Sequence, residues 1–184
     1  MSLTRPSSSE FASYYGNYVD TAGISLATLE GGTIPDLLTL QPVALRSLLD
    51  GAGESLGRHR YAPGKWTLAE SLLHVADTER VFCYRMLRIA RGDSTPLPGF
   101  DQDAWVPVSG ANSRSLSDIL TEIDVVRAAT LTLVHSLDEA SLERMGTASD
   151  QPVSARALAW IIAGHFAHHL DITRVRYLGI PAAS

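Results

Sequence analysis

The sequence predicts an all-α protein, a four-helix bundle with a long crossover loop and a short N-terminal helical arm. Apolar residues recur at helical spacing in four long segments. A stretch dense in Pro, Gly, Asp and Ser separates the second segment from the third, and no segment shows the alternation of a half-buried strand. Helices that each carry an apolar face bury those faces against one another, as in a bundle.

The first 35 residues form the expected arm, and residues 36–184 form the expected bundle, within a single domain overall. Within the arm, residues 11–19 are an aromatic helical candidate. The first bundle helix is predicted over residues 36–56, because its leucines follow helical spacing. Pro42 fits that helix only if it lies in the first turn, where no backbone N–H is needed.

Cap signals predict where the second helix starts. Thr67 is followed three residues later by Glu70, the spacing of a capping box, in which each side chain bonds the backbone N–H of the other residue. No helix breaker then occurs before Gly92, so about two dozen residues are predicted to be helical. The loop over residues 92–113 is about twenty residues long, and loops of that length in compact domains usually have a function. We expect it to cover a site.

Two further helices follow from the same signals. Ser115, with Asp118 three residues later, caps a third helix over residues 116–137. Ser154 starts a fourth helix, which runs to Tyr177 before a Gly and a Pro end it. The four helices complete the predicted bundle.

Composition and charge exclude several classes of protein. The formal net charge is -5, and Lys and Arg amount to 15 residues without a dense cluster, so a nucleic-acid partner is not expected. A lone Cys83 cannot form an intramolecular disulfide, and the N-terminal segment lacks the apolar region of a signal peptide, which predicts a cytoplasmic protein. No apolar run reaches the roughly 20 residues that span a bilayer, so membrane insertion is not expected.

Three of the six histidines lie in the segment AGHFAHHLDI, residues 163–172. Successive helical residues turn by about 100°, so His165 and His169 share the apolar stripe that faces the core, whereas His168 lies nearer the edge of that stripe. Two imidazoles one turn apart can reach a single metal ion. They can equally be core histidines whose nitrogens are satisfied by hydrogen bonds. The pattern alone leaves both interpretations open.

His74 lies on a polar strip of the second helix, which is otherwise apolar nearly all round. The other members of the strip are Thr67, Glu70, Ser71, Asp77, Thr78 and Arg85. The strip is either the solvent-facing side of the helix or the lining of an internal pocket opposite the fourth helix, and its small hydroxyl residues favour the pocket. Glu70 and Asp77 are candidate catalytic residues that could orient His74 or act as a base, although Glu70 already caps the helix.

Three distant segments resemble the DinB-like (DinB/YfiT) family of metal-dependent four-helix-bundle proteins, which is unrelated to the DNA polymerase of similar name. They are YAPGKWTLAESLLHVADTERVFCYRMLRIARGD, PLPGFDQDAWV and SARALAWIIAGHFAHHLDITRVRYLG. Together they cover roughly residues 61–179, and their order and spacing match the family pattern. The combination of three segments makes the resemblance fairly specific.

The resemblance implies a divalent metal ion held by three histidines, which are His74, His165 and His169 in this chain. Three protein nitrogens and one open position are typical of a catalytic zinc site, and nickel or iron could bind the same nitrogens. His168 then lies outside the ligand set, unless it or Asp77 completes a closed, structural shell.

The resemblance also implies a function, which we expect to be enzymatic. Several members of the wider family are S-transferases or isomerases that use low-molecular-weight thiols, and others are named only as metal-dependent hydrolases. We expect a small-molecule substrate and activation of a thiol by an S-transferase-like enzyme. The alternatives are a hydrolase that uses metal-bound water and a non-catalytic, stress-related bundle that binds a metal or ligand. Family members often form homodimers through helix faces, so a homodimer is also expected.

The loop segment that matches the family contains Asp101, Asp103 and Trp105. These residues either contact the mouth of the pocket or anchor the loop. In the second case Phe100 and Trp105 bury their rings while the aspartates cap turns, and the sequence favours this anchoring role.

Overall fold

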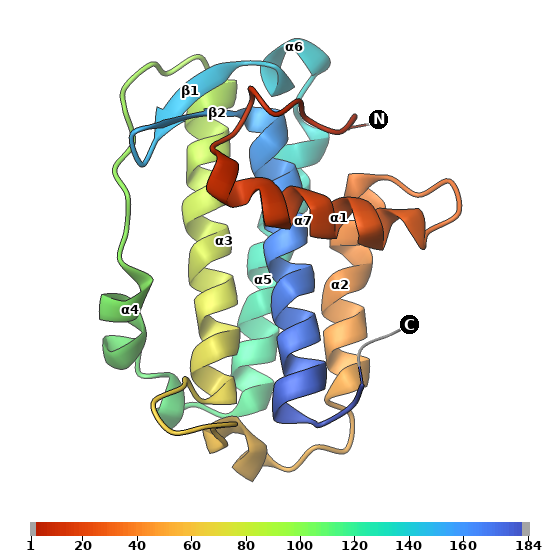
Figure 1. The fold of residues 1–184 in the computed structure, drawn as a ribbon, viewed down its shortest axis with the longest axis vertical. Coiled ribbons are helices and arrows are strands. Elements are labelled where there is room, and N and C mark those ends of the chain that lie inside the picture. The colour runs from red at the N-terminus through yellow and green to blue at the C-terminus, as the bar shows by residue number, and fades with distance from the viewer. Residues whose placement is uncertain (1–2, 182–184) are drawn as a thin grey trace.

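Four long helices form the body of the molecule in a computed structural model that describes residues 3–181 (Figure 1). They are α2 (Ile34–Leu48), α3 (Leu68–Ala90), α5 (Leu116–His135) and α7 (Ala155–Ile172). Helices α2 and α7 run in one direction, and α3 and α5 run in the other. The predicted all-α four-helix bundle is confirmed. No helix within the described residues is long and apolar enough to cross a membrane.

Side-chain caps set the starts of three of these helices at the predicted residues. In α3, Thr67 Oγ1 accepts a hydrogen bond from Glu70 N at 3.1 Å, and Glu70 Oε2 accepts one from Thr67 N at 2.7 Å. Ser115 and Ser154 cap α5 and α7 by accepting from the N–H three residues later. Each cap satisfies a donor that the helix leaves free, which stabilises it by about 1 kcal/mol.

The first bundle helix differs from the prediction. Helix α2 begins two residues before the predicted start and ends at Leu48, and the segment Glu54–Arg58 forms a separate 3-10 helix, η2. Pro42 lies inside α2 rather than in its first turn. Because proline has no N–H, the carbonyl of Leu38 four residues earlier lacks its helical donor. Arg127 of α5 replaces that donor, since its Nη1 donates to the Leu38 carbonyl at 2.5 Å.

The N-terminal arm contains a 3-10 turn, η1 (Ser13–Tyr15), followed by α1 (Gly16–Ala27). The helix therefore begins and ends later than the predicted residues 11–19. Figure 1 shows α1 crossing the front of α7 at a steep angle. The arm thus covers one side of the bundle.

The crossing of α1 over α7 depends on Gly164. A Cβ atom at this position would lie 1.8 Å from the carbonyl oxygen of Tyr18 and 2.5 Å from its carbonyl carbon, so only glycine permits this approach. The contact brings Tyr18 beside the next residue of α7, and the rings of Tyr18 and His165 have centroids 5.3 Å apart.

The crossover segment between α3 and α5 is folded into short helical turns. Because α3 and α5 run in the same direction, the chain returns along the side of α3 before α5 begins (Figure 1). On the way it forms α4 (Gln102–Trp105), η3 (Val106–Val108) and η4 (Ala111–Ser113). The predicted long loop is therefore present, with local structure of its own.

A short β-hairpin corrects the expectation that the chain has no strands. After α6 (Glu139–Leu142), strands β1 (Met145–Ala148) and β2 (Gln151–Ser154) pair antiparallel. The two residues between them, Ser149 and Asp150, have φ of 53° and 60°, which suits a tight hairpin turn. The hairpin leads directly into the cap of α7.

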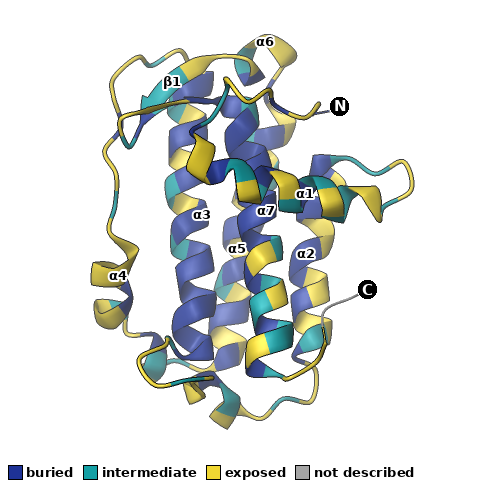
Figure 2. Cartoon of the chain, in the orientation of Figure 1, coloured by how far each residue is buried: buried dark blue, intermediate teal, exposed yellow. Residues whose placement is uncertain are grey.

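The final helix reaches Tyr177 as predicted, but its last turn is wider. Helix α7 ends at Ile172 and continues as a π-helical turn, η5 (Thr173–Tyr177). Figure 2 shows the lower half of α3 and the upper half of α7 buried almost all round. The other half of each helix has an exposed side, which in α3 carries Arg80, Tyr84 and Leu87. The polar strip of α3 faces this partly covered region of α7 and not bulk solvent, since His74, Ser71 and Thr78 are buried.

Candidate metal centre

His74 of α3 meets His165 and His169 of α7 between the two helices, and all three side chains are buried. One ring nitrogen of each lies within 4.8 Å of the others. The closest approach joins His74 Nε2 to His165 Nε2 at 3.2 Å. The structure therefore brings together the three histidines that the family resemblance implies as ligands.

Hydroxyl groups orient two of the three rings. Ser71 Oγ lies 3.1 Å from His169 Nδ1, and Thr78 Oγ1 lies 3.3 Å from His74 Nδ1. When each Nδ1–H donates to its hydroxyl, the Nε2 lone pair of the same ring stays available. A partner on the second ring nitrogen is the usual way in which proteins orient metal-binding histidines.

Burial keeps the three imidazoles in their neutral form. It lowers the pKa of His74 to about 4. Burial, and to a lesser extent the neighbouring histidines, also hold the pKa values of His165 and His169 well below the ordinary range. A metal ion binds neutral imidazole, so the cluster offers lone pairs rather than positive charge at neutral pH.

A divalent metal ion fits this set of donors. Two nitrogens bound to one tetrahedral zinc ion at about 2.1 Å lie about 3.4 Å apart, close to the spacing of His74 and His165. Across residues 3–181, the cluster comprises three imidazoles and no carboxylate or thiol. A tetrahedral ion would therefore keep one position that these side chains do not fill, which is typical of catalytic sites.

A cavity of about 330 Å³ opens beside the cluster and has His74 and His169 in its wall. The Trp66 ring packs against His74 with centroids 4.9 Å apart. The remaining wall is mostly aromatic or polar and consists of Tyr18, Tyr61, Gly64, Lys65, Ser71, Gln102, Asp103, His168, Ile172 and Tyr177. This volume suits a small molecule.

A second cavity of about 280 Å³ adjoins the same cluster. His165 lies in its wall, together with the aromatic rings of Phe82 and Phe100. Tyr18 and Gln102 line both cavities, so these two side chains separate them. The three histidines are thus reached from two sides.

The two carboxylates considered as catalytic candidates have other partners. Glu70 accepts hydrogen bonds from Thr67 N at 2.7 Å and Asn112 Nδ2 at 2.7 Å, and it pairs with Arg60 at 3.1 Å. Asp77 is half-buried and pairs with Arg80 at 3.3 Å. These contacts give Glu70 a structural role at the start of α3, and catalytic roles for either residue stay predictions.

The loop residues divide between the two roles considered for them. Asp101 caps α4 by accepting from Asp103 N at 3.0 Å, which agrees with a loop anchor. Trp105 stacks on Phe100 with centroids 5.0 Å apart, yet it remains exposed rather than buried. Asp103 lines the cavity beside His74, so it lies at the pocket mouth.

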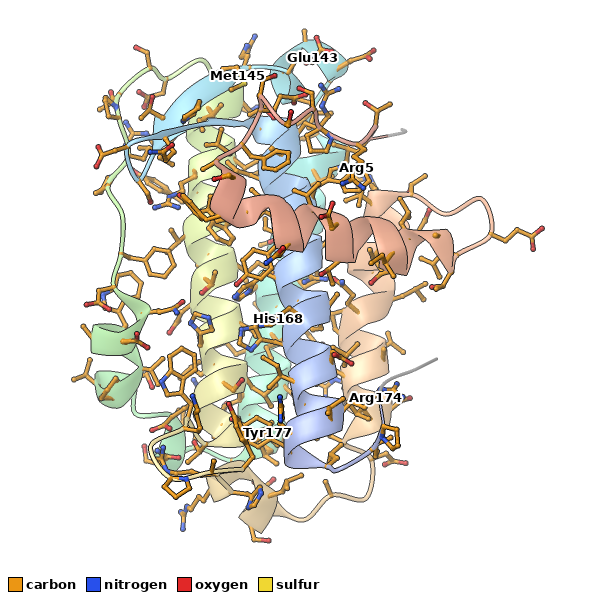
Figure 3. All side chains as sticks on the ribbon, in the orientation of Figure 1. Arg5, Glu143, Met145, His168, Arg174 and Tyr177 are labelled. Atoms are coloured by element: carbon orange, nitrogen blue, oxygen red, sulfur yellow. The ribbon has the colours of Figure 1, made fainter. Side chains whose placement is uncertain are left out.

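His168 is an exposed residue at the edge of the cavity and not a member of the three-histidine cluster. Figure 3 shows His168 and Tyr177 on the side of α7 that is turned toward α3. The Tyr177 hydroxyl donates to the Trp66 carbonyl at 2.8 Å and closes the lower end of the wall.

The wall residues that the sequence did not assign to the site include Trp66, Tyr177, Tyr18 and Gln102. Trp66 directly precedes the cap of α3, and Tyr177 lies eight residues after His169, so both stand near predicted ligands in the sequence. Tyr18 and Gln102 come from the arm and the crossover, and only the tertiary fold brings them to the histidines.

The fold and the cluster define a helical bundle with an internal three-histidine site. The sequence model of the DinB superfamily matches residues 37–172, a segment that contains all three histidines. The match covers well over half of the chain. This chain belongs to the DinB superfamily, as the resemblance of its three segments predicts.

Two known proteins are similar to this chain. A protein of Geobacillus thermodenitrificans (strain NG80-2) named "Putative metal-dependent hydrolase" is 24% identical over 130 residues, which cover 70% of this chain and 73% of that protein. A solved structure described as "YfiT from Bacillus subtilis is a probable metal-dependent hydrolase with an unusual four-helix bundle topology" aligns with a TM-score of 0.69. It has 16% sequence identity and covers 97% of this chain and 95% of its own, so it supports the fold alone.

Proposed function

We propose that this chain is a divalent-metal-dependent enzyme whose metal ligands are His74, His165 and His169. The observation that carries the proposal is the convergence of three neutral, buried imidazoles beside a cavity large enough for a small molecule. Three nitrogen donors suit zinc best and would also accept nickel or iron. The names of the relative and of the structural neighbour, both of which include metal dependence, support the same proposal.

The side chains around the cluster have separable tasks. Ser71 and Thr78 hold the His169 and His74 rings in fixed orientations through their Nδ1 atoms. Trp66 and Tyr18 cover His74 and His165 with aromatic rings and limit the access of water to them. Asp103 and His168, which also line the cavity, place polar groups at its mouth.

We propose transfer of a low-molecular-weight thiol to a small electrophile as the reaction, with hydrolysis as the second candidate. A divalent ion with an open position lowers the pKa of a thiol or of water, so it can supply either nucleophile. The hydrolase names of the two similar proteins favour the second candidate. The aromatic walls of both cavities suit an apolar electrophile in either reaction.

Metal binding tests the first step of this proposal. We expect metal-free protein to take up one equivalent of Zn²⁺, measured by calorimetry and by metal analysis after gel filtration. His165→Ala and His169→Ala should abolish stoichiometric uptake. His135→Ala is the matched control, because His135 is an exposed histidine at the end of α5. Unchanged uptake in the double variant His165→Ala/His169→Ala would show that the metal site is elsewhere.

A paired activity screen tests the reaction. Metal-loaded protein is incubated with alkylating electrophiles and a thiol such as glutathione, mycothiol or bacillithiol, and separately with activated esters and amides without thiol. Thiol-dependent consumption of the electrophile that is lost in His165→Ala supports transfer, and thiol-independent cleavage supports hydrolysis. Metal uptake without turnover in either set would overturn the enzymatic proposal in favour of a ligand-binding bundle.

A further inference from the structure

Arg85 of α3 is a buried cation that lacks a carboxylate partner. Its side chain is 1% exposed, and its Nη2 donates to the Pro98 carbonyl at 2.7 Å and to Ser149 Oγ at 3.0 Å. Within residues 3–181, Arg85 Nη1 is the one buried side-chain polar atom without a hydrogen-bond partner. No aspartate or glutamate of those residues lies within ion-pair distance of Arg85.

A buried arginine of this kind is unfavourable unless something supplies the missing acceptor. Arginine stays charged at every physiological pH, so Arg85 cannot escape the cost of burial by losing its proton. A buried charge without a counter-ion is destabilising, and each unsatisfied donor adds to that cost. The fold retains the guanidinium nevertheless, which points to an acceptor that comes from outside the chain.

The guanidinium lies directly behind the wall of the second cavity, packed against three of the residues that line it. The ring centroids of Phe82 and Phe100, which both line that cavity, are 5.8 and 5.7 Å from Arg85 Cζ. Ser149 lines it too, and because its Oγ accepts from Arg85, its O–H remains free to donate to a third group. Tyr15 lines it as well; burial raises the pKa of its phenol, whereas the nearby Arg85 acts in the opposite direction through its charge and a hydrogen-bond contact.

The same cavity lies between the side chains packed on Arg85 and the histidine cluster. His165 forms part of its wall, and the Phe82 ring centroid lies 6.2 Å from the His165 ring centroid. Arg85 is three helical turns after His74 on α3, and helical side chains point back toward the N-terminus, which directs the guanidinium toward the cluster. One aromatic ring therefore separates the cation from the candidate metal ligands.

We propose that Arg85, with Ser149, forms an anion-binding subsite that takes the carboxylate of a small aromatic or apolar substrate. The carboxylate accepts from Arg85 Nη1, and the apolar part of the molecule lies between the Phe82 and Phe100 rings and extends toward His165. The choice of substrate class rests on the proposed metal-dependent function, whereas binding of the carboxylate depends on Arg85 alone. The two can therefore be tested separately.

The test compares two probes of nearly equal shape, phenylacetate and its neutral amide phenylacetamide, in metal-free protein. We expect phenylacetate to bind at least about tenfold more tightly than phenylacetamide, measured by calorimetry or NMR titration near neutral pH. Arg85→Met should bind both probes with equal affinity. Arg85→Lys keeps the charge without the planar fork and should retain a weaker preference for the carboxylate.

Arg91→Met is the matched control, because it removes the same charge from an exposed position at the end of the same helix. It should keep the wild-type ratio of affinities. The proposal is overturned if phenylacetate shows no saturable binding, if both probes bind the unmodified chain equally, or if Arg85→Met keeps the preference. The comparison on the unmodified chain stays decisive even where Arg85→Met fails to fold.

The experiments also distinguish failure of the Arg85 subsite from failure of the proposed metal-dependent function. Discrimination between the probes without any zinc uptake would support the subsite and overturn the metal-dependent enzyme. Zinc uptake by the three histidines without discrimination would support the metal centre and overturn the subsite.

Discussion

Two faces of α3 carry buried polar groups, but the groups are fully paired within the chain on one face only. On the face toward α5, the buried Arg127 and Glu79 form an ion pair with N···O distances of 2.8 Å. On the face toward α7, His74 meets two other imidazoles, and Arg85 retains an unpaired Nη1. Both faces are equally removed from solvent, so burial alone does not tell a structural polar group from a functional one.

The Arg127 cluster is complete within the chain. In addition to Glu79, the guanidinium donates to the Leu38 carbonyl at 2.5 Å and to Gln41 Oε1 at 3.0 Å, and it lies 4.6 Å from the centre of the Phe166 ring. Gln41 in turn donates to the Ala163 carbonyl at 2.7 Å. The cluster joins all four bundle helices and leaves no strong donor for a ligand, so we assign it to stability.

On the face of α3 toward α7, the hydrogen bonding is not complete within the chain. Among the described residues Arg85 Nη1 has no acceptor, and the three imidazoles meet one another without a carboxylate or thiol. The imidazoles line two cavities, and Arg85 packs against residues that line one of them. Unsatisfied polar groups beside a cavity mark a binding site, whereas satisfied groups in a closed core mark a structural network. The following experiments test that distinction.

Breaking the Arg127 cluster should cause the largest loss in the free energy of unfolding. Arg127→Met leaves the Glu79 carboxylate buried without a partner and removes the donor for the Leu38 carbonyl beside Pro42. We expect a loss of about 3 to 5 kcal/mol in the free energy of unfolding, measured by urea denaturation. Arg46→Met, which removes an exposed pair between α2 and α5, should cost less than about 1 kcal/mol.

A second substitution checks why Arg127 matters to α2. Pro42→Ala restores an N–H that can donate to the Leu38 carbonyl, so it should recover part of the loss caused by Arg127→Met. Strict additivity of the two changes in a double-mutant cycle would contradict the idea that Arg127 replaces the missing helical donor.

Adding a side chain at Gly164, where α1 crosses α7, should cause the next largest loss in the free energy of unfolding. Gly164→Ala would put a methyl group into the Tyr18 backbone, so α1 must move away from α7. We expect a loss of about 3 kcal/mol in the free energy of unfolding, together with a change in Tyr18 fluorescence or in metal affinity. Gly16→Ala is the control, because nothing lies within 4 Å of a Cβ at Gly16 and that residue is already helical.

The partly buried ion pair of Glu10 and Arg156 makes the free energy of unfolding depend on pH. Burial favours neutral Glu10, but hydrogen bonds from Arg156, Ser7 and Ser154 outweigh it and lower the Glu10 pKa from 4.5 to about 2. The folded-state pKa lies below the unfolded one, so this stabilisation is complete above about pH 4.5 and is lost as the pH falls toward 2. It amounts to at most about 3 kcal/mol.

Glu10→Gln should therefore lower the free energy of unfolding at neutral pH and flatten its decline between pH 4.5 and 2, as followed by urea denaturation. Glu30→Gln, at an exposed carboxylate, should leave the curve unchanged. An identical acid dependence in Glu10→Gln and the wild-type chain would remove Glu10 from the acid response.

Removing one imidazole should have the smallest effect on the metal-free protein. His169→Leu replaces a half-satisfied polar ring with an apolar side chain, so its free energy of unfolding should stay within about 1 kcal/mol of wild type. Zinc at a hundredfold excess over its dissociation constant should then stabilise the wild-type chain by about 2.7 kcal/mol and the variant not at all. A large loss in the metal-free variant would place His169 among the structural residues instead.

Local signals were sufficient for most of the fold. Thr67, Ser115 and Ser154 cap helices at the predicted residues because capping involves only the next few residues. The predicted start of α2 was wrong because Pro42 is tolerated inside the helix through Arg127, 85 positions later in the chain. The predicted end was wrong because the chain leaves the helix after Leu48 and turns at Gly51, whose φ is 72°. The hairpin was missed because its strands have four residues each and its turn uses Ser149 and Asp150 rather than Asn-Gly.

The site was predictable to the extent that it follows helical faces. Face counting placed His165 and His169 together, and the polar strip of α3 contained His74 and also Arg85. The resemblance to the family then joined the two helices. The cavity walls were not predictable, because Tyr18 and Gln102 reach the histidines from segments that carry no periodic signal for that contact.

The wall of the cavity extends beyond the segment that the family model matches. Residues 37–172 match the superfamily and hold all three histidines, whereas Tyr18 and Tyr177 lie outside that segment and still form the cavity wall. The matched segment thus holds the three histidines and most of the cavity wall, and the flanking segments complete that wall. Substitutions at Tyr18 or Tyr177 would therefore change the shape of the cavity without altering any of the three histidines.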